Sequence, residues 1–150
     1  MTDADVFDLD RFTPYRLAVA AKRTSEELAI QYRTRFGISI PEWRVLVHLE
    51  SAGGDISVRD IEARVALEKY EISRTASRLE ERGLVTKSAS TTDRRLIRLA
   101  LTTEGRALMA DLLPLARAYQ EKIEKRLGAA FEGLEAALDQ LLKEGANPAD

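Results

Sequence analysis

Residues 72–85 read ISRTASRLEERGLV and residues 91–106 read TTDRRLIRLALTTEGR, and these two stretches decide the fold. In the first stretch the apolar residues recur every three or four positions, which is the spacing of one helix face. In the second, Ile97, Leu99 and Leu101 share one face in strict alternation with residues 96, 98 and 100, which is the period of a strand. The change of period predicts a helix that is followed by extended chain.

The predicted helix runs from about Lys69 to Arg82. Ile72, Ala76 and Leu79 share its inner face. Gly83 follows at the position where a glycine commonly ends a helix in the left-handed conformation. The outer face then carries donors and acceptors suited to base edges and phosphates, although a mixed polar face is also typical of a helix that simply meets solvent.

Two short extended runs, 84–88 and 96–101, follow this helix. The polar, turn-prone segment 89–95 lies between them and ends in adjacent arginines. The runs therefore predict a β-hairpin with a basic tip.

A shorter helix is predicted immediately upstream. Ser57 to Asp60 provides a serine and an acid for its start, Val58, Ile61 and Val65 face inward, and the turn falls at 66–68. Helix, turn, helix and basic hairpin, over Ser57 to Leu101, make a winged helix-turn-helix. In this arrangement one helix fits the wide major groove and the hairpin tip reaches the narrow minor groove, whose potential attracts arginine.

Long helices flank this segment on both sides. Upstream, Thr13 is predicted as the N-cap of a helix that begins with Pro14 and ends at Gly37. A capping box, Ser39 to Glu42, opens the next helix, which Gly53 and Gly54 terminate.

Downstream, Thr102 is predicted to cap a long helix, and Gly128 separates it from a last one. The fold class is therefore mainly α with a small β-hairpin wing, in the order α-α-(β)-α-α-β-β-α-α.

Charge is distributed unevenly along the 150 residues. Residues 57–98 contain 10 Lys/Arg and 7 Asp/Glu, whereas the remainder contains 13 and 18. A positive segment in an acidic chain is typical of a protein that presents one face to nucleic acid. The chain has no cysteine, which excludes disulfides, thiolate metal sites and thiol nucleophiles.

Motifs of other function classes are missing from the sequence. There is no phosphate-binding loop, no metalloprotease motif and no nucleophile beside a histidine, so we expect no enzyme, no cofactor and no metal site. No run approaches the roughly 20 apolar residues of a membrane span, and the acidic start lacks the features of a secretory signal. We therefore expect a cytoplasmic protein without membrane contact. A winged helix that binds another protein is the alternative to DNA binding.

The sequence resembles the MarR family of bacterial transcription regulators. The family pattern is Leu-Glu-x-x-Gly-Leu-Val, then Asp-x-Arg at the wing, then Leu-Thr-x-x-Gly. Here these blocks stand at 79–85, 93–95 and 101–105, with matching spacing between them. Helices flanking both ends extend the resemblance over essentially the whole chain.

This resemblance implies a homodimer that binds double-stranded DNA at a pseudo-palindromic operator. Residues 1–36 and 102–150 would form the helical dimerisation region, and 37–101 the DNA-binding lobe. Recognition helix 69–82 and wing 89–95 would read the operator. The resemblance further implies a repressor that is relieved by a small aromatic or other organic effector.

Site residues follow from this assignment. The resemblance implies that Arg95 enters the minor groove with Asp93 orienting it, while Arg94 contacts phosphate and Arg74 contacts either a guanine edge or a phosphate. The remaining candidates for DNA contact are Tyr70, Glu71, Ser73 and Arg78.

Two further groups of residues complete the prediction. In the family a ligand pocket lies between the dimer helices and the DNA lobe, where the candidates are Arg16, Tyr32, Trp43 and His48, although His48 and Trp43 also fit an ordinary packed core. A terminal apolar stripe serves either dimerisation or the intrachain core. Its members are Phe7, Leu9, Phe12, Leu127, Phe131, Leu134, Leu138 and Leu141.

Overall fold

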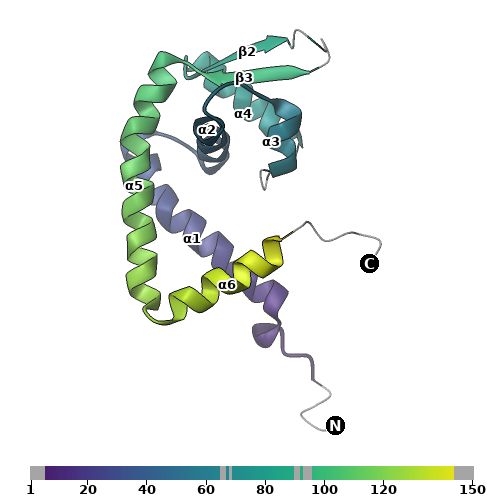
Figure 1. The fold of residues 1–150 in the computed structure, drawn as a ribbon, viewed down its shortest axis with the longest axis vertical. Helices are drawn as coiled ribbons and strands as arrows, with labels where there is room; N and C mark the ends of the chain where they lie inside the picture. Colours follow the sequence, from purple (N-terminus) through teal and green to yellow (C-terminus); the bar gives the residue numbers. More distant parts are fainter. Residues whose placement is uncertain (1–5, 65–66, 68, 90–91, 93–95, 144–150) are drawn as a thin grey trace. The chain divides into compact units, whose positions relative to one another are not determined.

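The structure is a computed structural model that describes residues 6–64, 67, 69–89, 92 and 96–143. Figure 1 shows its helices and its small sheet. The predicted fold class, mainly α with a β-hairpin wing, is confirmed. A short 3-10 turn precedes six helices and three strands in the described part: the turn Leu9–Arg11, α1 Thr13–Phe36, α2 Ile40–Ala52, β1 Ile56–Ser57, α3 Val58–Arg64, α4 Lys69–Glu81, β2 Val85–Ala89, β3 Ile97–Leu101, α5 Thr103–Leu127 and α6 Ala130–Leu142.

The chain forms two compact units, Met1–Leu115 and Ala116–Asp150, with the boundary inside α5. The first unit contains the helix-turn-helix and the sheet. The second contains the end of α5 and all of α6, in which no residue is buried. The predicted dimerisation region and DNA-binding lobe divide the chain by function and not by compactness. This division therefore remains a prediction.

The sheet is antiparallel, with strand order β1-β3-β2. In the hairpin Val85 pairs with Leu101 and Ala89 with Ile97, while Ile56 of β1 pairs with Leu99. The predicted start of the first strand at Leu84 is wrong by one residue. The N–H of Leu84 donates to the carbonyl of Leu79 at 3.0 Å, so Leu84 belongs to the turn that ends α4.

The hydrophobic core of the first unit contains residues from helices α1 to α5 and from all three strands. The predicted inner face of α4 is confirmed, because Ile72, Ala76 and Leu79 are almost fully buried. Full burial of a leucine or isoleucine side chain, such as Leu79 or Ile72, stabilises the fold by about 1.5–3 kcal/mol. The other buried hydrophobic residues are Ala29, Tyr32, Ile38, Val45, Leu46, Leu49, Ile56, Ile61, Leu84, Val85, Leu99, Met109 and Leu112.

Side chains cap three of the helix starts, those of α2, α3 and α5, as predicted. In the capping box of α2, Ser39 N–H donates to Glu42 Oε1 at 2.9 Å and Glu42 N–H donates to Ser39 Oγ at 3.3 Å. Ser57 Oγ accepts the N–H of Asp60 at 3.1 Å, and Thr102 Oγ1 accepts that of Gly105 at 2.9 Å. These bonds satisfy backbone donors that have no partner within the helix.

The prediction for Thr13 is wrong. The first bond of α1 runs from Arg16 N–H to the carbonyl of Phe12, which makes Phe12 the N-cap and Thr13 the first helical residue. Phe12 has no side-chain acceptor, and this helix start lacks a side-chain cap. The inward position of Val65 and the turn at 66–68 lie outside the described residues, apart from Leu67.

Candidate nucleic-acid interface

The outward face of α4 is polar and open. Burial of its inner face, which also includes Thr75, turns Tyr70, Ser73 and Arg74 to the outside. Tyr70 is 61% exposed. Glu71, by contrast, is half-buried.

A shallow hollow of about 370 Å³ lies along this face, lined by Ser73, Arg74, Ser77 and Arg78. The two serines and the two arginines are each four residues apart, so they form adjacent rows on the helix surface. Guanidinium and hydroxyl groups are suited to phosphate oxygens and base edges. The structure therefore brings together three of the predicted residues, namely Ser73, Arg74 and Arg78, with Ser77.

The predicted wing residues Asp93, Arg94 and Arg95 lie outside the described residues. The strands that carry this segment are described, and β2 is tied to the recognition helix. Lys87 Nζ donates to Ser77 Oγ at 2.7 Å, and Lys87 N–H donates to Glu80 Oε2 at 3.3 Å. Lys87 thus joins wing and recognition helix, a role that the sequence pattern does not reveal because its partners belong to a different element.

An ion pair ties β3 to the loop before β1. Arg98 Nε donates to Asp55 Oδ2 at 2.8 Å, and Arg98 Nη2 donates to Asp55 Oδ1 at 3.1 Å. This two-pronged hydrogen bond holds the pKa of the Asp55 carboxyl below its ordinary value and raises the pKa of Arg98. The pair fixes the edge of the wing opposite to β2.

Replacing Asp55 by Asn is expected to destabilise the protein near neutral pH and much less in acid. Because folding lowers the pKa of Asp55, the ion pair contributes stability above the unfolded pKa of about 3.9, and the contribution is lost as pH falls through the lower folded pKa. Urea unfolding of both proteins at pH 7 and pH 3 measures this. Glu135→Gln, on exposed α6, is the control, and a difference between wild type and Asp55→Asn that is constant with pH would contradict the assignment.

The structure explains the threonine and the glycine of the motif Leu-Thr-x-x-Gly at 101–105. Thr102 Oγ1 donates to the carbonyl of Gly83 at 2.6 Å, and Thr102 N–H donates to that of Leu84 at 3.0 Å. A Cβ on Gly105 would clash with the Leu84 carbonyl oxygen and lie 3.2 Å from Leu101 Cδ2. The start of α5 thus packs directly on the turn that ends the recognition helix, where Gly83 has φ +74°.

The predicted ligand residues are only partly brought together. Tyr32 and Trp43 stack with ring centroids 5.4 Å apart, and burial raises the pKa of the Tyr32 phenol. His48 Nδ1 lies 2.7 Å from the Arg44 carbonyl oxygen, so Nδ1 carries the proton. Arg16 lies exposed in the first turn of α1.

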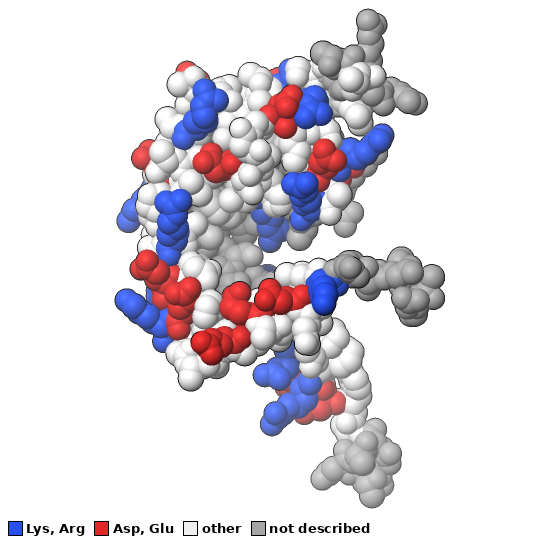
Figure 2. Space-filling view, in the orientation of Figure 1, with Lys and Arg blue, Asp and Glu red and all other residues white. Residues whose placement is uncertain are grey.

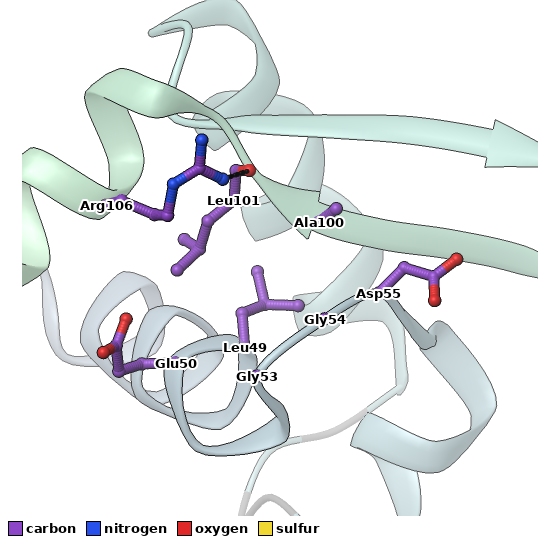
Figure 3. Close-up of a pocket in the computed structure, with 8 residues that line it drawn as sticks. All are labelled: Leu49, Glu50, Gly53, Gly54, Asp55, Ala100, Leu101 and Arg106. Atoms are coloured by element: carbon purple, nitrogen blue, oxygen red, sulfur yellow. Dashed lines mark hydrogen bonds between the residues drawn. The ribbon is translucent and has the colours of Figure 1, made fainter.

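A cavity of about 150 Å³ lies elsewhere, between the end of α2, β3 and the start of α5. Figure 3 shows Leu49 and Leu101 pointing toward each other inside it, with the Arg106 guanidinium turned to the Leu101 carbonyl at 3.1 Å. None of the four predicted ligand residues lines this cavity.

Many of the predicted dimerisation residues are exposed in the single chain. Phe7 is 69% exposed although its ring packs edge-to-face on Phe12 at 5.1 Å, and Leu141 is 62% exposed. Leu9, Phe12 and Leu134 are also exposed, whereas the other three predicted residues are half-buried: Leu127, Phe131 and Leu138.

The last helix differs from the recognition helix in its charge. Figure 2 shows acidic side chains gathered along α6. This helix carries Glu132, Glu135 and Asp139 and no basic residue, so it is unsuited to phosphate. Within the described residues, none of the helices has the length and apolar character to cross a membrane.

A helix-turn-helix followed by a hairpin that packs on the recognition helix defines the winged-helix class. Within that class, residues 36–96 match the sequence model of the MarR family. The resemblance to this family is thereby confirmed. The matched residues include the recognition helix and both β1 and β2.

Solved structures of MarR-type regulators are similar over nearly the whole chain. A MarR family regulator from Silicibacter pomeroyi is 26% identical, with 89% of this chain and 88% of that chain covered and a TM-score of 0.72. Bordetella bronchiseptica BpsR, whose DNA binding is regulated by 6-hydroxynicotinic acid, is 19% identical, with coverage of 93% and 98% and a TM-score of 0.77. A mutant MarR from E. coli, complexed with operator DNA, is 22% identical, with coverage of 85% and 91% and a TM-score of 0.73. The Silicibacter pomeroyi protein is a transcriptional regulator, and the other two structures concern DNA binding.

Proposed function

We propose that this chain is a homodimeric, sequence-specific DNA-binding regulator that reads a pseudo-palindromic operator with helix 69–82 and wing 89–95. The outward face of α4 carries the proposal, because Ser73, Arg74, Ser77 and Arg78 line one hollow while the opposite face is sealed in the core. An α-helix fits the major groove, where such donors distinguish base pairs. The DNA-bound E. coli MarR, which has the same fold, supports this assignment.

Each DNA contact has a proposed role. Arg74 contacts a guanine edge or a phosphate, and Ser73 and Arg78 flank it. Tyr70 and Glu71 extend the same surface toward the start of the helix. At the wing, Arg95 enters the minor groove, Asp93 orients it and Arg94 contacts phosphate.

Dimerisation through residues 1–36 and 102–150 is part of the proposal. A two-fold dimer presents one recognition helix to each half-site of a pseudo-palindrome. The exposed apolar residues at both ends of the chain, such as Phe7 and Leu141, support it. An apolar side chain gains about 25 cal/mol for each Å² that a partner removes from water.

Regulation by a small molecule is the third part. We propose a cytoplasmic repressor that is released from DNA by an aromatic or other small organic effector, as the regulation of BpsR by 6-hydroxynicotinic acid suggests. Arg16, Tyr32, Trp43 and His48 are the proposed contacts. Saturation-transfer NMR with small aromatic acids tests the ligand class, and an absence of transfer would count against it.

Selection of bound DNA from a random pool tests the function itself. The expected product is a palindrome with half-sites about one helical turn, roughly 34–36 Å, apart. Binding should weaken steeply with salt, because each neutralised phosphate releases counterions. Recovery of no preferred sequence, or of binding that is insensitive to salt, would contradict the proposal.

Two arginine variants separate base recognition from sequence-independent affinity for DNA. Arg74→Ala is expected to cost about 1–3 kcal/mol and to relax base preference at one position if its contact with guanine is bidentate. Arg95→Ala is expected to weaken binding to all sequences and to reduce the salt slope by about one. Fluorescence anisotropy at several salt concentrations measures both, with Lys125→Ala on α5 as the control. Unchanged operator affinity in both variants would refute the assigned surface.

A further inference from the structure

The end of the recognition helix is held by one arginine side chain. Arg82 follows α4 directly, and its N–H donates to the Arg78 carbonyl at 3.1 Å. Its guanidinium bonds to residues at the end of α1. It donates from Nη2 to the Phe36 carbonyl at 3.2 Å and from Nη1 to the Gly37 carbonyl at 3.2 Å. These are carbonyls at the C-terminal end of α1, where helix carbonyls lack partners and the helix dipole favours a cation.

The same guanidinium also binds the start of α2. Arg82 Nη1 lies 3.1 Å from Glu42 Oε2. Glu42 is only 7% exposed, and its other oxygen accepts the Ser39 N–H of the capping box. Both oxygens of this buried carboxylate are therefore engaged, one by the helix start and one by Arg82. The Arg82 side chain is itself 40% exposed, so the ion pair joins a buried carboxylate to a guanidinium that still meets solvent.

Arg82 thus connects three helix ends: the end of α4, the end of α1 and the start of α2. A lysine cannot reproduce this pattern, because its single ammonium lacks the planar fork that reaches carbonyls and a carboxylate together.

We propose that Arg82 is a positioning residue that locks the recognition helix to the end of α1. The inference rests on the proposed function, in which α1 belongs to the dimerisation region and α4 reads DNA. The lock transmits the geometry of the dimer helices to α4. The spacing of the two recognition helices then matches the two half-sites only while Arg82 is in place.

Paired DNA duplexes test this inference. Arg82→Lys is expected to weaken binding to the full palindrome by about tenfold or more while binding to a single half-site changes less than about twofold. Arg106→Lys is the matched control, since Arg106 also bonds a carbonyl and a hydroxyl but within the junction of β3 and α5. Equal losses on both duplexes, or no loss on either, would overturn the inference. Failure of the wild type to bind any duplex would instead refute the proposed function.

A second measurement needs no DNA. Because the chain lacks cysteine, Gln31→Cys and Tyr70→Cys place spin labels on α1 and α4 of one chain, diluted with unlabelled protein. Electron–electron distance measurements are expected to give a broader α1–α4 distribution in Arg82→Lys than in wild type or Arg106→Lys. Glu42→Gln, which keeps a hydrogen-bond acceptor but removes the charge, should broaden it less. An unchanged distribution in Arg82→Lys would overturn the inference even if the variant is less stable.

Discussion

Gly105→Ala is expected to lower the free energy of unfolding by about 1–3 kcal/mol, the largest stability effect that we predict for a one-carbon change. The added Cβ would overlap the carbonyl oxygen of Leu84, and it would lie 3.1 Å from the Leu84 carbonyl carbon. Both atoms belong to the backbone, so no side-chain rotation relieves the clash. The same carbonyl accepts the N–H of Thr102, which means that moving it also disturbs the start of α5.

Gly133→Ala is the matched control for this prediction. Gly133 lies inside α6, and a Cβ there would meet no atom within 4 Å. Because alanine is a better helix former than glycine, this variant should be stabilised by up to about 1 kcal/mol. Urea unfolding followed by circular dichroism measures both changes. Two changes of the same sign, or a neutral Gly105→Ala, would show that the junction of Leu84 and α5 is not as tight as the structure has it.

Local patterns predicted most of the helices and strands. The inner face of α4 follows from the spacing of Ile72, Ala76 and Leu79, and the box at Ser39 and Glu42 follows from hydrogen bonds three residues apart. The two wrong predictions are each displaced by one residue, because backbone hydrogen bonds place the helix start or the strand start at the neighbouring position. Phe12 became the N-cap in place of Thr13, and Leu84 joined a helix end instead of a strand.

The long-range polar links could not be predicted from the sequence. Arg82 meets acceptors 40 to 46 residues away, and Arg98 meets Asp55 43 residues away. No local period encodes such pairs, because they depend on how the helices and strands pack. The outward face of α4 was predictable for the opposite reason, since burial of one helix face determines which residues remain outside.

Leu134→Glu combined with Leu141→Glu is expected to convert the proposed dimer to monomers. These leucines lie seven residues apart on one face of α6, and both are exposed in the single chain. Placing two carboxylates in a dimer interface costs several kcal/mol, because charges lose hydration there without gaining partners. The isolated chain should tolerate the change, since these positions already meet solvent.

Analytical ultracentrifugation and binding to full and half palindromes measure the effect of this double variant. A monomer with a single recognition helix loses the gain from simultaneous binding at two half-sites, which amounts to about 10²-fold or more in affinity. Half-site affinity should stay close to that of wild type, because the hollow on α4 is unchanged. Gln140→Glu is the control, since it adds a charge to α6 at an exposed polar position. A double variant that stays dimeric would show that α6 is not the dimerisation helix, and the apolar residues near Phe7 would then have to form the interface without it.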